Sequence, residues 1–205
     1  MSGRLAGRIA LITGGSGGLG SATVRAFAQE GVAGLGIQYH GNKARAEDLV
    51  AETERAGSRA LALPCNATHR KEAFKLVRSA AEGLGGLDVL VCFAGHPFRR
   101  DEWFTPFEEL TPEVLLKPLE IDLLGSLYVA QAAIPYLRRS GAGRIVFAAS
   151  TPAVSGDVVG ISYLLAKGAL LSLTRSLARY LGPDSVQVNA LVLGSIDTPA
   201  MAGLT

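Results

Sequence analysis

The sequence predicts a single α/β domain built on a doubly wound parallel sheet with helices on both faces. Short apolar runs alternate with helix-length segments along the whole chain, which is the pattern of a parallel sheet. The runs are continuously apolar, as in strands that are buried on both faces. The length of 205 residues suits one domain with one good core.

Six apolar runs are the candidate strands, and a helical stretch follows each of the first five. The predicted strands span residues 9–12, 34–39, 60–64, 89–93, 144–148 and 186–193. The predicted helices span residues 21–30, 43–56, 70–83, 112–138 and 162–181. In the fourth helix Thr111 is the N-cap and Pro112 the first helical residue. Pro118 lies inside this stretch and should kink or split the helix.

A glycine-rich turn, TGGSGGLG, joins the first strand to the first helix. It fits G-x-G-x-x-G from Gly15, T-G-x-x-x-G-x-G from Thr13 and G-x-x-G-x-x-G from Gly14. Glycines allow a tight turn and a close approach of the backbone to a pyrophosphate at the positive helix N-terminus. The strand–turn–helix context therefore predicts a Rossmann-type dinucleotide site.

Ser150, Tyr163 and Lys167 supply the groups that move a proton onto or off an oxygen. Tyr163 and Lys167, four residues apart, share one helical face. A free phenol has a pKa of about 10, and a neighbouring cation pulls this pKa towards the working range. The serine hydroxyl binds a substrate oxygen without carrying charge. None of the three moves a hydride, so a cofactor is needed.

These motifs resemble the common short form of the short-chain dehydrogenase/reductase family, from about Gly3 to Met201. The resemblance implies hydride transfer between a nicotinamide cofactor and a small carbonyl or secondary alcohol substrate. It implies that Ser150 orients the substrate and that Tyr163 is the general acid/base. Lys167 is implied to bind the nicotinamide ribose and to lower the pKa of Tyr163.

The resemblance also implies a set of cofactor-binding residues, spread over the ends of the predicted strands. Ala94 and Gly95 follow the fourth strand, and Ile196 and Thr198 resemble the residues that hold the nicotinamide carboxamide. The full implied set is Gly14, Ser16, Gly18, Leu19, Gly20, Tyr39, His40, Asn66, Ala67, Ala94, Gly95, Tyr163, Lys167, Ile196 and Thr198.

The cofactor type is readable from the second strand. A carboxylate about twenty residues past the glycine turn would favour NAD. There is no acid between Glu30 and Glu47, whereas Lys43 and Arg45 follow the strand. An acid-free site with cations nearby favours the extra phosphate of NADP, although the two cations also suit the solvated start of a helix.

The chain departs from the family pattern at several positions. Asp122 stands where a helix asparagine usually links the lysine to solvent. It accepts hydrogen bonds, but when ionised it cannot donate and adds a charge near Lys167. The other departures are Cys92 and Phe93 for two asparagines, Asn66 for an acid that meets adenine, and Leu193 for a proline.

Family members continue for several tens of residues past the position of Thr205. We expect residues 1–205 to form one dinucleotide-binding and catalytic domain that lacks the family's C-terminal substrate loop, helix and last strand. The sheet would then keep an open edge. The apolar segment 169–177 resembles a helix that family members use to dimerise, which favours a homodimer or homotetramer, and the alternative is ordinary core packing.

Composition excludes several other classes of protein. The net charge of +2 is too small to indicate nucleic acid or a membrane surface. No uncharged apolar run reaches the ~20 residues of a spanning helix, and no secretory signal is visible. Cys65 and Cys92 lack metal or redox spacing, so we expect buried, reduced thiols in a cytoplasmic protein. The three histidines show no metal-ligand spacing, and we expect no metal.

Two other functions remain compatible with the sequence. A cofactor-binding sensor or scaffold of the same fold would keep the glycine turn and lose efficient chemistry. A sugar-nucleotide epimerase would share the glycine spacing and the Tyr-x-x-x-Lys pair, although the chain is short for that class. The segment 96–104, with mixed aromatic and charged side chains, is either a substrate wall or a solvated loop anchored by Trp103.

Overall fold

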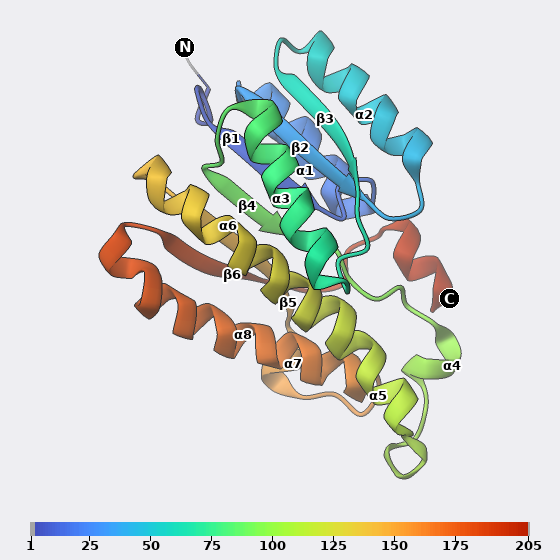
Figure 1. The fold of residues 1–205 in the computed structure, drawn as a ribbon. Helices are drawn as coiled ribbons and strands as arrows, with labels where there is room; N and C mark the ends of the chain where they lie inside the picture. Colours follow the sequence, from blue (N-terminus) through green and yellow to red (C-terminus); the bar gives the residue numbers. More distant parts are fainter. Residues whose placement is uncertain (1–2, 205) are drawn as a thin grey trace.

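Six parallel strands form one sheet in the order β3-β2-β1-β4-β5-β6 in the computed structural model, which describes residues 3–204 (Figure 1). The strands are β1 (Ile9–Thr13), β2 (Gly34–Tyr39), β3 (Arg59–Pro64), β4 (Val89–Cys92), β5 (Arg144–Ser150) and β6 (Gln187–Leu193). The predicted doubly wound α/β fold is confirmed, and every predicted strand is present within two residues of its expected bounds.

Helices cover both faces of the sheet in three layers. One face carries α1 (Gly18–Gln29) and α2 (Lys43–Arg55). The other carries α3 (Arg70–Leu84), α6 (Ser126–Ser140) and α8 (Ile161–Leu181), of which α3 and α6 cross the near face in Figure 1. The shorter helices are α4 (Arg100–Trp103), η1 (Phe107–Glu109), α5 (Pro112–Pro118), η2 (Leu119–Gly125), α7 (Pro152–Ser155), η3 (Gly182–Asp184) and η4 (Pro199–Gly203).

Two apolar cores lie on opposite faces of the sheet because successive strand residues point to opposite sides. Leu11, Ile145 and Phe147 belong to the core under α3, α6 and α8. Ile12 and Ile37 belong to the core under α1 and α2. Each of these five side chains is fully buried, and such burial stabilises the fold by about 1.5–3 kcal/mol per side chain.

The switch point of the sheet lies between β1 and β4. The chain winds outward from β1 through β2 to β3, and then returns to the other side of β1 to form β4. In such sheets ligands bind outside the carboxyl ends of the strands at the switch point. The register brings these ends together, since Thr13 pairs with Cys92 and Ser150 with Leu193.

Pro118 splits the fourth predicted helix, as expected. Helix α5 ends at Pro118, a seven-residue π-helical segment, η2, follows, and α6 begins at Ser126. Proline has no N–H to donate and its ring clashes with the preceding turn, so the regular α-helical ladder is broken there. A π-helical segment inside a longer helix is often found at a functional site.

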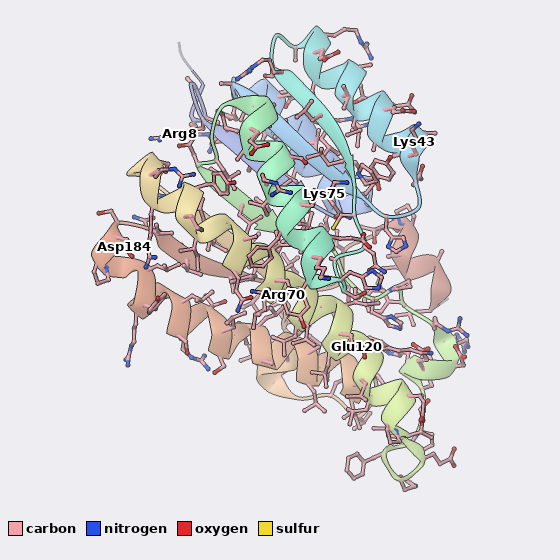
Figure 2. The ribbon with its side chains drawn as sticks, in the orientation of Figure 1. Arg8, Lys43, Arg70, Lys75, Glu120 and Asp184 are labelled. Atoms are coloured by element: carbon pink, nitrogen blue, oxygen red, sulfur yellow. The ribbon has the colours of Figure 1, made fainter. Side chains whose placement is uncertain are left out.

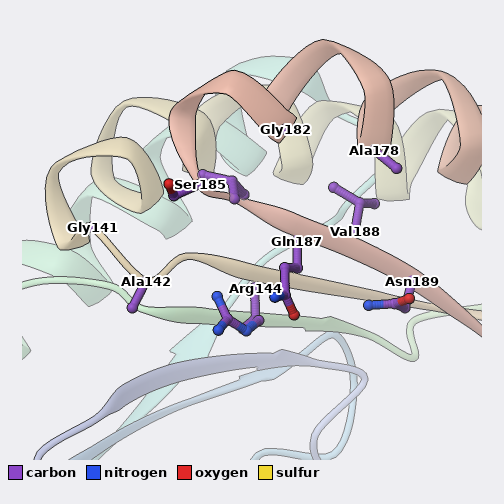
Figure 3. A pocket seen from close by; sticks show the side chains of 10 residues that line it. Gly141, Ala142, Arg144, Ala178, Gly182, Ser185, Gln187, Val188 and Asn189 are labelled. Carbon is purple, nitrogen blue, oxygen red and sulfur yellow. The ribbon is translucent and has the colours of Figure 1, made fainter.

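Strand β6 forms one edge of the sheet. Strand β6 pairs with β5 along its length and with no other segment of the part that the structure describes. A hollow of about 530 Å³ lies between the end of α8 and the start of β6, lined by residues such as Arg144 and Gln187 (Figure 3). These residues begin their strands, so the hollow lies at the opposite end of the sheet from the switch-point edge.

Candidate active site

The glycine turn after β1 is tight enough to require glycine at two positions. Gly14 has a φ of +62°, and a Cβ there would lie 2.7 Å from the backbone nitrogen of Ala94. A Cβ on Gly20 would lie 2.1 Å from the carbonyl oxygen of Gly14. Because neither backbone can retreat without moving a strand end, glycine alone fits here.

The N-terminus of α1 fits a dinucleotide phosphate. The N-cap, Gly17, carries no side chain to cap the helix, and there is no acid in the first turn. The first N–H groups of a helix have no intrahelical acceptor and therefore suit an anion. Of the predicted cofactor-binding residues, Gly18 and Leu19 begin α1 and Ser16 lies in the turn before it.

Gln38 ties the glycine turn to the sheet, and sequence reasoning missed it. Its side chain is 2% exposed. The carboxamide oxygen accepts a hydrogen bond from the Gly14 N–H at 2.7 Å, and the amide group donates to the Cys65 carbonyl at 2.8 Å. The available signal was a polar residue inside an otherwise apolar buried strand, since buried polar groups are normally hydrogen-bonded.

The predicted adenosine-side residues follow β2 and β3. Tyr39 is buried at the end of β2, and His40 is exposed just beyond it. The Asn66 side-chain oxygen accepts from the Thr68 N–H at 3.1 Å and from the Thr68 hydroxyl at 2.8 Å, so it already holds a local turn. Ala67 is buried beside η2.

The two cations after β2 lie at the start of α2, and Lys43 has an ion-pair partner there. Lys43 begins this helix at the surface (Figure 2). Its ammonium group lies 3.4 Å from Glu47, and the Asn42 side chain caps the helix by accepting from the Arg45 N–H at 3.1 Å. Both cations therefore lie on an exposed helix start next to the end of β2.

The residues predicted to hold the nicotinamide side of the cofactor approach the glycine turn from two directions. The Ala94 N–H donates to the Thr13 hydroxyl at 3.2 Å, which fixes the segment after β4 against β1. Thr198 packs so closely that a Cβ on Gly18 would lie 2.8 Å from its own Cβ. Ile196 lies in the same connection and is partly exposed. The chain after β6 therefore folds back over the start of α1.

The three central residues come from the end of β5 and the start of α8. Strand β5 continues two residues beyond its predicted end, so Ser150 is its last residue and is buried. Tyr163 and Lys167 lie on successive turns of α8, and the Lys167 ammonium is 5.4 Å from the centre of the Tyr163 ring. The spacing in the sequence therefore does become proximity in space.

Burial and charge act in opposite directions on Tyr163. Burial raises the pKa of this phenol, whereas the Lys167 cation and a hydrogen bond with Ser150 lower it. The Asp122 carboxylate raises it again, and the net result is a pKa above the ordinary value. Lys167 lowers the pKa of Tyr163, as the resemblance implies, but burial of the phenol outweighs this effect.

Asp122 lies directly against Lys167. The Asp122 Oδ1 and Lys167 Nζ atoms are 2.7 Å apart, and both side chains are buried. The second carboxylate oxygen, Oδ2, accepts a hydrogen bond from the His96 N–H at 2.8 Å. Burial is the largest single influence and lowers the pKa of Lys167, but the ion pair with Asp122 and the nearby Tyr163 and Cys92 together raise this pKa above its usual value.

An aromatic cluster covers one side of Tyr163. The ring centres of Phe98 and Trp103 lie 5.2 and 5.5 Å from that of Tyr163, and 5.1 Å from each other. The Trp103 carbonyl accepts a hydrogen bond from the Gly160 N–H at 2.7 Å, which ties this segment to the start of α8. The segment 96–104 is therefore packed on the site, as a substrate wall would be.

A largely buried hydrogen bond between a histidine and a carboxylate supports the same segment, and sequence reasoning missed it. His96 Nε2 lies 2.5 Å from Glu102, and Lys117 lies 2.9 Å from the other oxygen of that carboxylate. The side chains of His96 and Glu102 are largely buried. His96 therefore has a structural role inside a loop, held by partners 6 and 26 residues away.

The cysteines are not among the predicted catalytic residues, although Cys92 lies within electrostatic reach of Lys167. The two cysteines are free and buried, as expected, and burial raises the pKa of Cys65 to about 11 and that of Cys92 to about 12. Among residues 3–204 no three His, Cys, Asp or Glu side chains gather as they would around a metal ion. Nor does any helix in that range have the length and apolar character to cross a membrane.

Comparison with known proteins agrees with this geometry. Residues 8–205 match the family described as short chain dehydrogenase. An uncharacterized oxidoreductase of Bacillus subtilis is 32% identical over 97% of this chain. Cis-4-hydroxycyclohexanecarboxylate dehydrogenase of Sinomonas cyclohexanicum is 35% identical over 96% of this chain. The chain spans 66% of the length of the former protein and 76% of the latter.

A solved structure shows the same fold. A short chain dehydrogenase from Burkholderia cenocepacia, in complex with NADP, superposes with a TM-score of 0.87 at 34% identity. The match covers 96% of this chain and 78% of that one. With a family match over nearly its whole length, the chain belongs to the short-chain dehydrogenase/reductase family.

Proposed function

We propose that the protein catalyses hydride transfer between a nicotinamide cofactor and a small carbonyl or secondary alcohol. The observation that carries this proposal is that Tyr163 interacts with both Ser150 and Lys167, while Ser150 and the glycine turn follow parallel strands at the same end of the sheet. A bound nicotinamide supplies or accepts the hydride. The carbonyl carbon gains that hydride and the oxygen gains a proton, which gives the alcohol, and the reverse reaction removes both.

The protein's own groups handle the oxygen and its proton. In our proposal Tyr163 Oη gives the proton to the substrate oxygen or takes it away. Ser150 donates a hydrogen bond to the same oxygen and so holds the substrate in place. Lys167 binds the nicotinamide ribose, and its charge acts on the phenol of Tyr163. Asp122 takes part through Lys167 and does not touch the substrate.

We infer that NADP is the cofactor and NAD the weaker alternative. Gln38, Tyr39 and His40 carry no acid to repel the extra phosphate, and Lys43 and Arg45 lie at the start of the next helix. The phosphates would lie on the N–H groups at the start of α1. The residues proposed to hold the rest of the cofactor are the set predicted above, with Gln38 as the side chain that fixes the turn.

The substrate we propose is an apolar ketone or alcohol with a ring. Phe98 and Trp103 offer flat apolar surfaces next to Tyr163, and such surfaces pack well against rings. The relative from Sinomonas cyclohexanicum is named for a hydroxylated cyclohexane acid. Cyclohexanones are therefore the first substrates to try.

We propose further that the protein works in the cytoplasm as a homodimer or homotetramer. Helix α8 carries exposed apolar side chains, among them Leu165 and Tyr180. Exposed apolar groups along one helix suit an interface with a second copy.

The experiment is an assay of NADPH oxidation with a panel of cyclic ketones and of NADP reduction with the matching alcohols. We expect turnover with at least one pair. Binding of NADPH, seen by protein fluorescence, without turnover across the panel would favour the sensor or scaffold instead.

A further inference from the structure

The carboxylate of Asp122 is enclosed with the Lys167 ammonium in the interior. Asp122 is 1% exposed and Lys167 is 8% exposed, and their charged atoms are 2.7 Å apart. Apart from this ion pair, Asp122 Oδ1 has no hydrogen-bond partner within the described chain. A buried carboxylate without a partner would be costly, so the ammonium is what holds this oxygen.

The groups around the Asp122 side chain suit a carboxylate. Two donors face it, the Lys167 ammonium at Oδ1 and the His96 N–H at Oδ2. A carboxylate has two acceptor oxygens, whereas an asparagine has one and would turn its NH₂ towards one of the donors. Gly95 leaves the space, since a Cβ there would lie 3.0 Å from Oδ1. The π-helical segment η2 carries Asp122 into this position.

The Asp122–Lys167 ion pair weakens the electrostatic effect of Lys167 on the Tyr163 phenol. A lone ammonium 5.4 Å from the ring centre would favour the phenolate strongly. A carboxylate in contact with that ammonium cancels much of its field. Burial raises the pKa of Tyr163, and Asp122 acts in the same direction, against the effects of Lys167 and Ser150.

Other titratable groups near the Asp122–Lys167 pair do not replace Asp122 as the partner of Lys167. Burial raises the pKa of the Cys92 thiol on β4 to about 12, so the thiol is neutral at neutral pH. Behind Asp122, the His96 ring on the loop after β4 pairs with Glu102 of α4. Lys117 of α5 pairs with the same Glu102 carboxylate. Arg99 also lies 3.3 Å from this carboxylate, so Glu102 has its own cationic partners in Lys117 and Arg99.

We propose that Asp122 neutralises Lys167 and so keeps Tyr163 a phenol at neutral pH, which suits the site to carbonyl reduction more than to alcohol oxidation. This inference rests on the proposed function. Reduction needs a proton donor: the Tyr163 proton goes to the substrate oxygen as a hydride from a reduced nicotinamide dinucleotide reaches the carbonyl carbon. The phenolate then takes a proton from solvent.

The sign of the pH dependence follows from the protonation state. A phenol with a raised pKa stays protonated to higher pH, so reduction persists to higher pH. Oxidation needs the phenolate, so its rate rises only as the pH approaches that raised value. Removal of the Asp122 charge lets the ammonium act in full on the phenol. Both pH profiles should then move to lower pH.

The test is a spectrophotometric titration of the Tyr163 phenol itself. The chain has five tyrosines, so the tyrosinate absorbance of a Tyr163→Phe variant is subtracted to isolate the signal of Tyr163. The same subtraction is made in the Asp122→Asn background. We expect the midpoint to fall by about one pH unit in Asp122→Asn, which corresponds to a tenfold change in the ionisation equilibrium.

Two further variants serve as a control and as a second removal of the Asp122 charge. Glu120→Gln removes a carboxylate from the same segment η2, but from an exposed position on the outside of the molecule (Figure 2), and should leave the midpoint unchanged. Asp122→Ser removes the charge with a smaller polar side chain and should shift the midpoint in the same direction as Asp122→Asn. Circular dichroism identifies the variants that fold.

The outcomes separate this inference from the proposed function. A midpoint that is unchanged or higher in both folded Asp122 variants would overturn the charge pairing, even in an active enzyme. A lower midpoint in a chain without turnover would overturn the proposed function and the preference for reduction. A lower midpoint, together with reduction and oxidation profiles that both move to lower pH, is the result we expect.

Discussion

At the scale of single residues, Gln38 and Asp122 have similar structural roles. Each is a polar side chain enclosed in the interior, and each joins two parts of the chain that are distant in sequence. Burial of such a group costs free energy unless every strong hydrogen-bonding atom finds a partner. Their partners are the glycine turn and Lys167, so in our proposal both side chains position the site as well as stabilise the fold.

We expect Gln38→Leu to weaken cofactor binding and to destabilise the protein. The change removes the acceptor of the partly buried Gly14 N–H and the donor to the buried Cys65 carbonyl, so two backbone groups lose their partners. The free energy of unfolding should fall by about 1–3 kcal/mol, and the dissociation constant of NADPH should rise about tenfold, measured by denaturant titration and fluorescence. Gln187→Leu, at an exposed position on β6, is the control and should change neither.

Which site residues could be predicted depended on the distance between partners in the sequence. Tyr163 and Lys167 lie four residues apart on one helix, so their proximity follows from helix geometry. The Asp122–Lys167 pair and the aromatic cluster around Tyr163 join segments that meet only in the folded chain. No spacing rule links these residues, and their contacts emerged only from the tertiary structure.

At the scale of elements, two local irregularities place the site. The glycine turn lets α1 begin directly against the end of β1. The break at Pro118 and the π-helical segment η2 place Asp122 next to α8. The apolar pattern and the proline predicted the strands and the split helix. The π-helical form of the segment was beyond sequence reasoning, because it depends on what packs around it.

We expect Gly20→Ala to distort the glycine turn. The added Cβ would lie 2.1 Å from the Gly14 carbonyl oxygen, so the start of α1 must shift away from β1. The cost of such overpacking is about 1–3 kcal/mol of the free energy of unfolding, and NADPH binding should weaken as well. Gly182→Ala is the matched control, because a Cβ there meets nothing within 4 Å. Equal stability and NADPH affinity in the two variants would contradict this account of the turn.

At the scale of the whole molecule, the order of the strands decides where the chemistry takes place. The chain reverses its winding between β1 and β4, and the glycine turn, Ala94, Ser150 and Thr198 all lie at the strand ends of that edge. The alternation of strands and helices predicted this architecture because sequential α/β units have few ways to pack. The hollow lined by Arg144 and Gln187 lies at the opposite end of the sheet.

The cofactor preference is a property of the surface beyond β2. We expect the Michaelis constant for NADPH to be at least about tenfold lower than that for NADH, since the site lacks the acid that would bind the ribose hydroxyls of NADH. Arg45→Ala should raise the constant for NADPH and leave that for NADH unchanged. A lower Michaelis constant for NADH than for NADPH in the unaltered protein would contradict the assignment of NADP.

The most direct test of the central claim is the turnover of Tyr163→Phe, with Tyr180→Phe as control. Both changes remove one hydroxyl from α8, but Tyr180 is 62% exposed and lies far along the helix. We predict that kcat falls by about 10²–10⁴-fold in Tyr163→Phe, while the NADPH dissociation constant stays within about twofold and Tyr180→Phe keeps full activity. A Tyr163→Phe variant that reduces ketones at the rate of the unaltered protein would contradict the claim that Tyr163 is the general acid.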